Sequence, residues 1–200
     1  SSKYERILQL LKSQFHASPY MEKYVMEALF VMGEGNYALE RVQKRFEEMV
    51  NDSNYTTLFE GWGIGERGFG GGTTNHAWSG GGQTVIAKHL CGIEPLEAGY
   101  GTFLIEPCPA SFISASITVP TVKGKIHSSF TNIMERFTLK VTVPQNTTAI
   151  VRLPKGETIK VNGKEPSAGQ QKLGEKWSKA GKIALALKPG EYVIIRNKRI

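Results

Sequence analysis

The sequence is poor in cysteine and has no long apolar run. Its two cysteines, Cys91 and Cys108, are too few for a disulfide framework and do not have the spacing of zinc ligands. We therefore expect two free, buried thiols, although the sequence is also compatible with one disulfide between them. No stretch of about 18 or more apolar residues occurs, so no membrane-spanning helix is expected.

A secretory signal peptide is also missing from the amino-terminal residues. The segment "SSKYERILQLLK" has neither the apolar stretch nor the small-residue cleavage site of such a peptide. Its abrupt helical start indicates a chain cut from a longer protein. The compartment then depends on that parent, which would be periplasmic or extracellular if it carries a signal peptide and cytoplasmic otherwise.

Positive charge exceeds negative charge without gathering in one place. Lysine and arginine number 25 against 18 aspartates and glutamates, a formal net charge of +7. A nucleic-acid site would need a basic stripe with interleaved aromatic residues, and the basic residues are instead mixed with acidic ones. We expect a solvated, lysine-rich surface and no nucleic-acid partner.

Residues 1–92 have the apolar periodicity of helices. Ser18 and Pro19 are typical of an N-cap followed by proline at the first helical position, and the glycines of "GEG" end the helix that they begin. A third helix follows directly. The segment "GGQTVIAKHLCG" predicts a fourth helix, which Gly92 ends.

Residues 93–200 change to the period of strands. Short segments rich in β-branched residues alternate apolar and polar positions and are separated by Gly, Pro and Asn. They predict an antiparallel β-sandwich, and "VNGK" predicts a tight hairpin turn. The fold class is therefore α+β. The expected strands lie at 102–107, 114–120, 124–130, 137–144, 147–154, 158–163, 182–187 and 191–196.

One stretch, "TTLFEGWGIGERGFGGGTTNHAWSGG", gathers residues of unlike chemistry. Aromatic residues flank Glu60; they disfavour a charged carboxylate by desolvation, which suits a base. The alternative is a loop glutamate that accepts hydrogen bonds from backbone amides. His76 either begins the next helix or contacts a ligand. It has no histidine or cysteine partner at ligand spacing, so neither a metal nor a cofactor is expected.

Two indoles lie in the same stretch. Trp62 and Trp78 fit two roles equally, since an indole face can stack on the C–H face of a sugar or pack in a core. The glycine-rich run lacks the Gly-Lys-Ser/Thr of a phosphate loop. We interpret it as a long loop whose backbone can approach a ligand closely. Glu66 and Arg67 within it could hydrogen-bond a sugar or face water.

These motifs occur in a specific order. "TTLFEGW" fits Thr-Thr-x-x-Glu-x-Trp, and it is followed by "NHAWSGG", "CGIEPLEAGYGTFLIEP", "KGKIHSSF" and "FTLKVTVPQNTTAIVRLP". In this order the chain resembles the C-terminal part of bacterial α-L-rhamnosidases of glycoside hydrolase family 78. The resemblance covers nearly the whole chain. It implies that residues 1–92 are the last helices of an incomplete (α/α)6 barrel and that 93–200 are the C-terminal β-sandwich.

The resemblance also implies a chemistry. Enzymes of this family hydrolyse terminal α-L-rhamnose with inversion, so one carboxylic acid protonates the leaving oxygen and a second carboxylate activates water. By the motif, Glu60 is the general base, His76 contacts sugar hydroxyls, and Trp62 and Trp78 line the sugar pocket. No motif before Glu60 matches the family's general acid. We therefore expect rhamnosides as substrates of the parent and no activity of the isolated chain.

Other functions remain open. The β half could be a non-catalytic carbohydrate-binding or structural module with the helices as its adaptor, or the parent could be a different glycosidase on the same barrel, because a fold does not fix a substrate. A barrel remnant would leave apolar helix faces partly uncovered, which favours a homodimer or helices that pack back on the sandwich. The residues expected on those faces are Tyr24, Leu29, Leu39 and Phe46.

Overall fold

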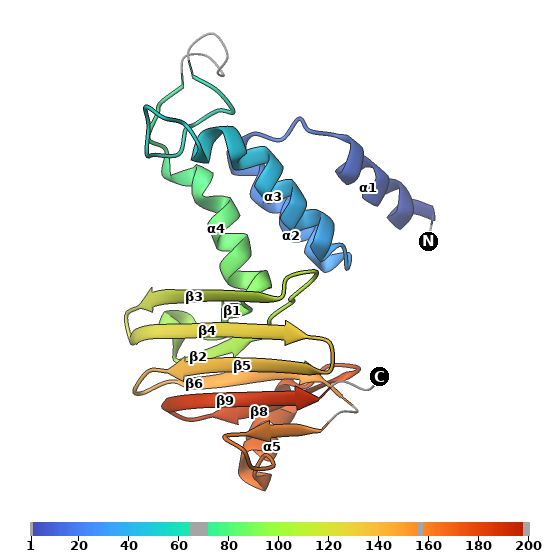
Figure 1. Cartoon of the computed structure of the whole chain (residues 1–200), viewed down its shortest axis with the longest axis vertical. Helices are drawn as coiled ribbons and strands as arrows, with labels where there is room; N and C mark the ends of the chain where they lie inside the picture. Colours follow the sequence, from blue (N-terminus) through green and yellow to red (C-terminus); the bar gives the residue numbers. More distant parts are fainter. Residues whose placement is uncertain (1, 65–71, 156–157, 198–200) are drawn as a thin grey trace. The chain divides into compact units, whose positions relative to one another are not determined.

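The structure is a computed structural model that describes residues 2–64, 72–155 and 158–197 (Figure 1). Most of the glycine-rich run lies outside the described residues, and so do Glu66 and Arg67, for which the sequence predicted a sugar or solvent contact. No helix within the described ranges is both long enough and apolar enough to cross a membrane.

The chain divides into two compact units. We call Ser1–Ile86 the helical unit and Ala87–Ile200 the sandwich unit. Helices in the first and two sheets in the second confirm the predicted α+β class. The predicted domain boundary between residues 92 and 93 stays a prediction, and so does the assignment of the helices to an (α/α)6 barrel.

The helices of the first unit begin and end close to where the sequence predicts. The Ser18 side chain caps α2 by accepting a hydrogen bond from the Met21 amide, with Pro19 at the first helical position. Gly33 takes a φ of +83°, a left-handed conformation that ends the helix. The helices are α1 (Ser2–Ser13), α2 (Pro19–Val31), α3 (Gly35–Val50) and α4 (Gly81–Val85).

The core of the helical unit lies among α2, α3, α4 and the segment that follows α3. Met26, Phe46, Met49, Phe59 and Val85 form one buried cluster. Partly buried side chains of the segment after α3 pack against this cluster. They are Leu58, Trp62 and Ile64.

This packing corrects one expectation. Leu29, Leu39 and Phe46 are buried, with at most 6% of their surface exposed, and the prediction that they are partly uncovered is wrong. α4 packs on α2, and the segment that follows α3 packs on the cluster that contains Phe46. Tyr24 is exposed, as expected. The predicted homodimer stays a prediction.

A buried carboxylate ties α1 to the helix pair. Glu22 is fully buried on α2, and its two oxygens accept hydrogen bonds from the Arg41 guanidinium on α3. Arg41 also donates to the carbonyl oxygens of Leu11 and Gln14, at 2.7 Å and 3.0 Å. A buried ion pair is stable only when its remaining donors are also satisfied. The last turn of α1, with Leu11, and the residue that follows the helix, Gln14, supply those acceptors.

The sandwich unit consists of two sheets, seen as separate layers in Figure 1. One has the strand order β3-β4-β5-β9-β7 and is antiparallel throughout; the other has the order β1-β2-β6-β8. Each predicted strand is present. The strands are β1 (Ile93–Pro95), β2 (Thr102–Ile105), β3 (Ser114–Thr121), β4 (Gly124–Ile133), β5 (Arg136–Val143), β6 (Thr148–Pro154), β7 (Ile159–Val161), β8 (Lys182–Leu187) and β9 (Gly190–Asn197).

The second sheet is mixed, which corrects the prediction of a wholly antiparallel sandwich. β2 and β6 pair in parallel, with Thr102 opposite Thr148 and Ile105 opposite Val151. Between them the chain crosses to the other sheet as β3, β4 and β5. The chain then returns to the second sheet as β6, which runs in the same direction as β2. A parallel pair requires such a long crossover connection.

Burial differs between the strands of the two sheets. β5 buries alternate residues from Phe137 to Val143, as expected of a strand with one face on a core. β6 buries every residue from Ala149 to Leu153, so both of its faces are covered. A short helix, α5 (Ala168–Gly174), packs against β8 of this sheet. A Cβ atom at Gly174 would lie 2.2 Å from the Ala184 carbonyl oxygen.

The sequence did not predict α5. Ser167 and Gln170 form a capping box at its start, but the helix is short and its largest apolar residue, Leu173, is 60% exposed. No apolar period marks it. The turn at "VNGK" is as predicted: Asn162 and Gly163 both have positive φ, the conformation of a two-residue hairpin turn.

The two cysteines differ from expectation in one respect. Both are free; Cys91 is buried, but Cys108 is exposed. Burial raises the pKa of the Cys91 thiol to about 11. Cys91 follows a π-helical turn at Ile86–Leu90, and Gly92, at φ +79°, ends the fourth helix where the sequence predicts.

Candidate functional site

The residues around Glu60 are held by bonds between two segments of the helical unit. The Glu60 amide donates to the Thr73 carbonyl oxygen at 2.9 Å, and the His76 amide donates to the Leu58 carbonyl oxygen at 2.8 Å. These bonds place the first motif, with Glu60, beside the second motif, with His76. The glycine-rich run therefore leaves and returns at one place.

Thr73 links the carboxylate of Glu60 to the ring of His76. Its amide and hydroxyl both lie near Glu60 Oε2, at 3.1 Å and 3.4 Å, and the hydroxyl oxygen lies 3.0 Å from His76 Nδ1. One hydroxyl proton cannot serve both partners. When it is donated to Glu60, Thr73 accepts the Nδ1–H of His76. When it is donated to His76, Nδ1 carries no hydrogen and the Thr73 amide alone donates to Glu60.

Glu60 has a more polar environment than the sequence suggests. Its side chain is 35% exposed and accepts the Thr73 amide, so the alternative of a loop glutamate bonded to backbone is realised. Aromatic rings are nevertheless close, because the Trp78 indole N–H lies 3.4 Å from the Glu60 carbonyl oxygen. The carboxylate is thus partly hydrated and held by hydrogen bonds, as a proton acceptor near water would be.

His76 begins a helical turn, one of the two roles that the sequence left open. It is the residue before the 3-10 turn Ala77–Gly80, and its side chain makes no capping bond to that turn. The ring instead packs on Trp78, with centroids 4.2 Å apart. Trp78 in turn stacks on Tyr20, at 5.2 Å and an interplanar angle of 29°.

Trp62 has the core-packing role, one of the two that the sequence allowed, and its role in stacking on a sugar stays a prediction. It packs on the helical core, with Phe46 edge-on at 5.1 Å. Its indole N–H donates to the Ala17 carbonyl oxygen at 2.7 Å. It also lines a pocket that Glu60 and Trp78 share.

That pocket has a volume of about 380 Å³, within the roughly 300–1,000 Å³ of typical small-molecule sites. Three of the four predicted site residues line it. His76 does not, and it reaches the pocket through its contacts with Glu60 and Trp78. The lining residues are His16, Ser18, Pro19, Glu60, Gly61, Trp62 and Trp78.

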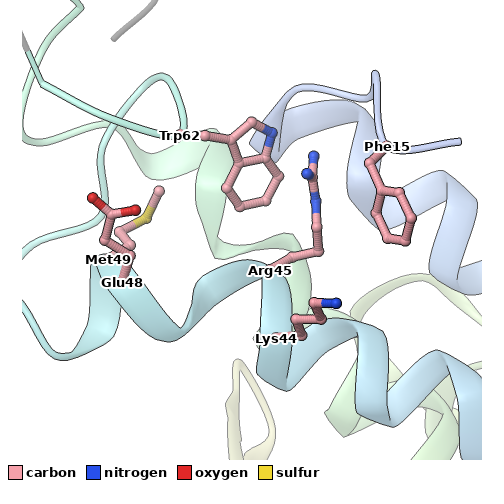
Figure 2. A pocket seen from close by; sticks show the side chains of 6 residues that line it. All are labelled: Phe15, Lys44, Arg45, Glu48, Met49 and Trp62. Atoms are coloured by element: carbon pink, nitrogen blue, oxygen red, sulfur yellow. The ribbon is translucent and has the colours of Figure 1, made fainter. Parts of the chain in front are cut away.

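Trp62 also lines a second pocket, of about 360 Å³ (Figure 2). The guanidinium of Arg45 lies between the rings of Trp62 and Phe15, 4.0 Å and 5.7 Å from their centroids. Its NH2 group donates to the Ala17 carbonyl oxygen at 2.7 Å, the atom that also accepts the Trp62 N–H. Desolvation lowers the pKa of Arg45.

Arg45 therefore fixes two walls of the first pocket at once. Stacking holds the Trp62 ring, and the bond to Ala17 holds the segment that carries His16 and Ser18. Sequence analysis identified neither Arg45 nor Thr73. Their roles arise from contacts between segments distant in sequence, and neither position belongs to a motif or an apolar period.

No group of three or more His, Cys, Asp or Glu side chains that could hold a metal ion occurs among residues 2–64, 72–155 and 158–197. The site therefore offers a carboxylate, hydroxyl, imidazole and aromatic rings. These groups can accept a proton, hydrogen-bond hydroxyls and stack on apolar ring faces.

Comparison by sequence places one part of the chain in a known family. Residues 92–168 match the bacterial alpha-L-rhamnosidase C-terminal domain. An alpha-L-rhamnosidase of Formosa agariphila is 33% identical over 145 residues, which cover 68% of this chain and 16% of that protein. The chain therefore spans a small share of its relative's length.

Solved structures of similar fold extend the match to the helical unit. An alpha-L-rhamnosidase from Dictyoglumus thermophilum matches 88% of this chain and 20% of its own, with a TM-score of 0.71 and 21% identity. The enzyme of Streptomyces avermitilis, complexed with L-rhamnose, gives 0.65 at 21% identity over 88% of this chain and 17% of its own. That of Aspergillus terreus gives 0.66 at 20% identity over 96% and 21%. At 20–21% identity these matches show a similar fold and nothing further.

Proposed function

Because residues 92–168 belong to the bacterial alpha-L-rhamnosidase C-terminal domain family, we propose that this chain is part of an enzyme that releases terminal α-L-rhamnose from glycosides. The resemblance predicted from the motifs is confirmed by these matches. In our proposal the helical unit contributes one wall of the active site. Glu60 is the general base, Trp62 and Trp78 line the sugar pocket, and His76 contacts sugar hydroxyls.

One observation carries this proposal. The pocket brings the Glu60 carboxylate together with two indoles in a volume suited to a single sugar ring. A carboxylate held by Thr73 and partly open to water can accept a proton from a water molecule as that water attacks the anomeric carbon. The indoles offer apolar faces or edges to the C–H groups of the sugar.

We further propose an inverting mechanism in which this chain supplies the base. Inversion uses two carboxyl groups about 6.5–9.5 Å apart on opposite sides of the sugar. Glu60 is the carboxylate among the described lining residues. The general acid would then come from a part of the enzyme outside this chain. Since general acid catalysis contributes roughly 10²–10⁴-fold, the isolated chain would show no measurable turnover.

Binding and turnover test the proposal together. We expect methyl α-L-rhamnoside to shift the indole N–H signal of Trp78 in nitrogen-15 NMR spectra of the 200-residue chain, and an aryl α-L-rhamnoside to remain uncleaved. In a longer protein that contains this chain and is active, Glu60→Gln would abolish turnover, because an amide keeps the shape but accepts no proton from water. A fast-leaving aryl group would not restore turnover, because such a leaving group removes only the need for the general acid and not for the general base.

A matched control is Glu40→Gln, an exposed glutamate on α3, which would leave both readouts unchanged. Turnover by the isolated chain would contradict the proposal that the general base lies in this chain and the general acid outside it. Wild-type turnover in the Glu60→Gln enzyme would show that Glu60 is not the general base. A Trp78 signal that ignores rhamnoside would show that this pocket is not the sugar site.

A further inference from the structure

Three exposed aromatic rings continue from the pocket along α2. Tyr20 stacks on Trp78, and Tyr24 meets Tyr20 edge-on, with centroids 5.7 Å apart and an interplanar angle of 77°. We call Trp78, Tyr20 and Tyr24 the aromatic ladder. Between 39% and 45% of the surface of each residue is exposed. Rings that served only as core would be covered, as Phe46 and Phe59 are.

The ladder begins at the rim of the pocket. Trp78 lines the pocket, and so do Ser18 and Pro19, which directly precede Tyr20 in the chain. A molecule that fills the pocket and extends beyond its rim on this side meets Tyr20 next.

The ladder is also held in place before any ligand binds. Trp78 supports one face of Tyr20, and the hydroxyl groups of Tyr20 and Tyr24 lie 3.3 Å apart in a hydrogen bond. That bond raises the pKa of Tyr20. A surface whose side chains are already ordered loses less conformational entropy when it binds.

We propose that the aromatic ladder binds the ring to which the terminal sugar is attached, through an apolar ring face that stacks on Tyr20. Two kinds of group present such a face: an aryl group and the C–H side of a pyranose. The inference rests on the proposed function, because it places the terminal sugar in the Glu60 pocket. It adds a binding site for the ring that is joined to the terminal sugar through the glycosidic bond.

Three ligands separate the contributions of the two rings. Methyl α-L-rhamnoside has the terminal sugar alone, p-nitrophenyl α-L-rhamnoside adds an aryl ring, and a rhamnosyl-glucose disaccharide adds a pyranose. Each is titrated into the 200-residue chain, with the Trp78 indole N–H as reporter and that of Trp177, in the sandwich unit, as internal reference. An aromatic contact is worth roughly 0.5–1.5 kcal/mol, so we expect at least one two-ring ligand to bind about two- to tenfold more tightly than the methyl glycoside.

Substitutions at Tyr20 identify the ladder as the source of this gain. We expect Tyr20→Ala to abolish the gain, so that a two-ring ligand and methyl α-L-rhamnoside bind that variant about equally well. Tyr20→Phe should retain most of the gain, because the ring is kept. Tyr4→Ala, which removes a comparably exposed tyrosine from α1, would change nothing. The arm that shows the gain tells whether an aryl group or a sugar is preferred.

The outcomes that overturn the inference differ from those that overturn the proposed function. Two-ring ligands that bind no better than the methyl glycoside, or a gain that survives Tyr20→Ala, would refute the ladder as a binding site. Methyl α-L-rhamnoside that leaves the Trp78 signal unmoved would refute the proposed sugar pocket. A gain that depends on Tyr20 without any response to the methyl glycoside would support the ladder and refute the sugar pocket.

Discussion

The carboxylate of Glu60 and the imidazole of His76 lie 3.9 Å apart, from Oε2 to Nδ1, and the hydroxyl of Thr73 contacts both. This contact joins two motifs, "TTLFEGW" and "NHAWSGG", that the glycine-rich run separates in the sequence. It makes the orientation of the carboxylate dependent on a threonine that belongs to neither motif.

Removing the Thr73 hydroxyl should loosen the Glu60 carboxylate. Thr73→Val keeps the shape and the backbone amide bond but deletes the hydroxyl. A hydrogen bond to a charged group contributes roughly 1.5–3 kcal/mol, and the partial exposure of Glu60 reduces this to about 1 kcal/mol. In a longer, active protein we expect turnover to fall about fivefold and Thr73→Ser to preserve it. Equal losses in both variants would contradict a role for the hydroxyl.

Breaking the buried ion pair of the helical unit should destabilise it strongly. Glu22→Gln leaves the Arg41 guanidinium buried beside an uncharged partner, a change that typically costs about 3–5 kcal/mol. Urea unfolding followed by circular dichroism would measure the loss. The control is the pair of Lys12 and Glu34, which is about one-third exposed. Lys12→Ala should cost about 1 kcal/mol or less, and a similar loss in both variants would refute the distinction.

The two cysteines should differ in reactivity. The exposed Cys108 should react with a thiol reagent at pH 8 in the folded protein, whereas Cys91 should not, because burial raises its pKa to about 11 from an ordinary value of 9.0. Mass spectrometry after brief labelling would locate the modified residue. Labelling of Cys91 at the rate seen in urea would contradict its burial.

The raised pKa of Cys91 also predicts how stability depends on pH. The folded protein binds the thiol proton more tightly than the unfolded chain, so this contribution is fully present below pH 9. It is lost as the pH rises from about 9 to about 11. Over that range the free energy of unfolding should fall more steeply in the wild type and in Cys108→Ser than in Cys91→Ala. Parallel curves would refute the assignment.

Two glycines with almost the same φ should respond differently to alanine. Gly92 and Gly163 have φ of +79° and +80°, but a Cβ atom at Gly92 would lie 2.2 Å from the Glu106 carbonyl carbon, whereas Gly163 has nothing within 4 Å. Gly163→Ala should therefore cost about 1 kcal/mol from backbone strain alone. Gly92→Ala adds a backbone clash and should lower the melting temperature much further. Equal effects would show that the sandwich can shift to accommodate the methyl group.

Features set by neighbouring residues could be predicted from the sequence. The cap of α2 at Ser18, the ends of helices at Gly33 and Gly92, and the turn at Asn162 and Gly163 all follow from local backbone preferences. The strands follow from their alternating apolar residues. The motif around Glu60 could likewise be recognised, because its residues are adjacent in the chain.

The tertiary structure decided which distant residues meet. No local pattern specifies the parallel pairing of β2 with β6, the contact of Tyr20 with Trp78, or the exposure of Cys108. Each depends on how the chain returns to a surface formed elsewhere, so its energy comes from packing between segments rather than from propensity within one. The sequence therefore determined most of the elements and the motif that contains Glu60, and long-range packing determined the pocket and the residues that surround it.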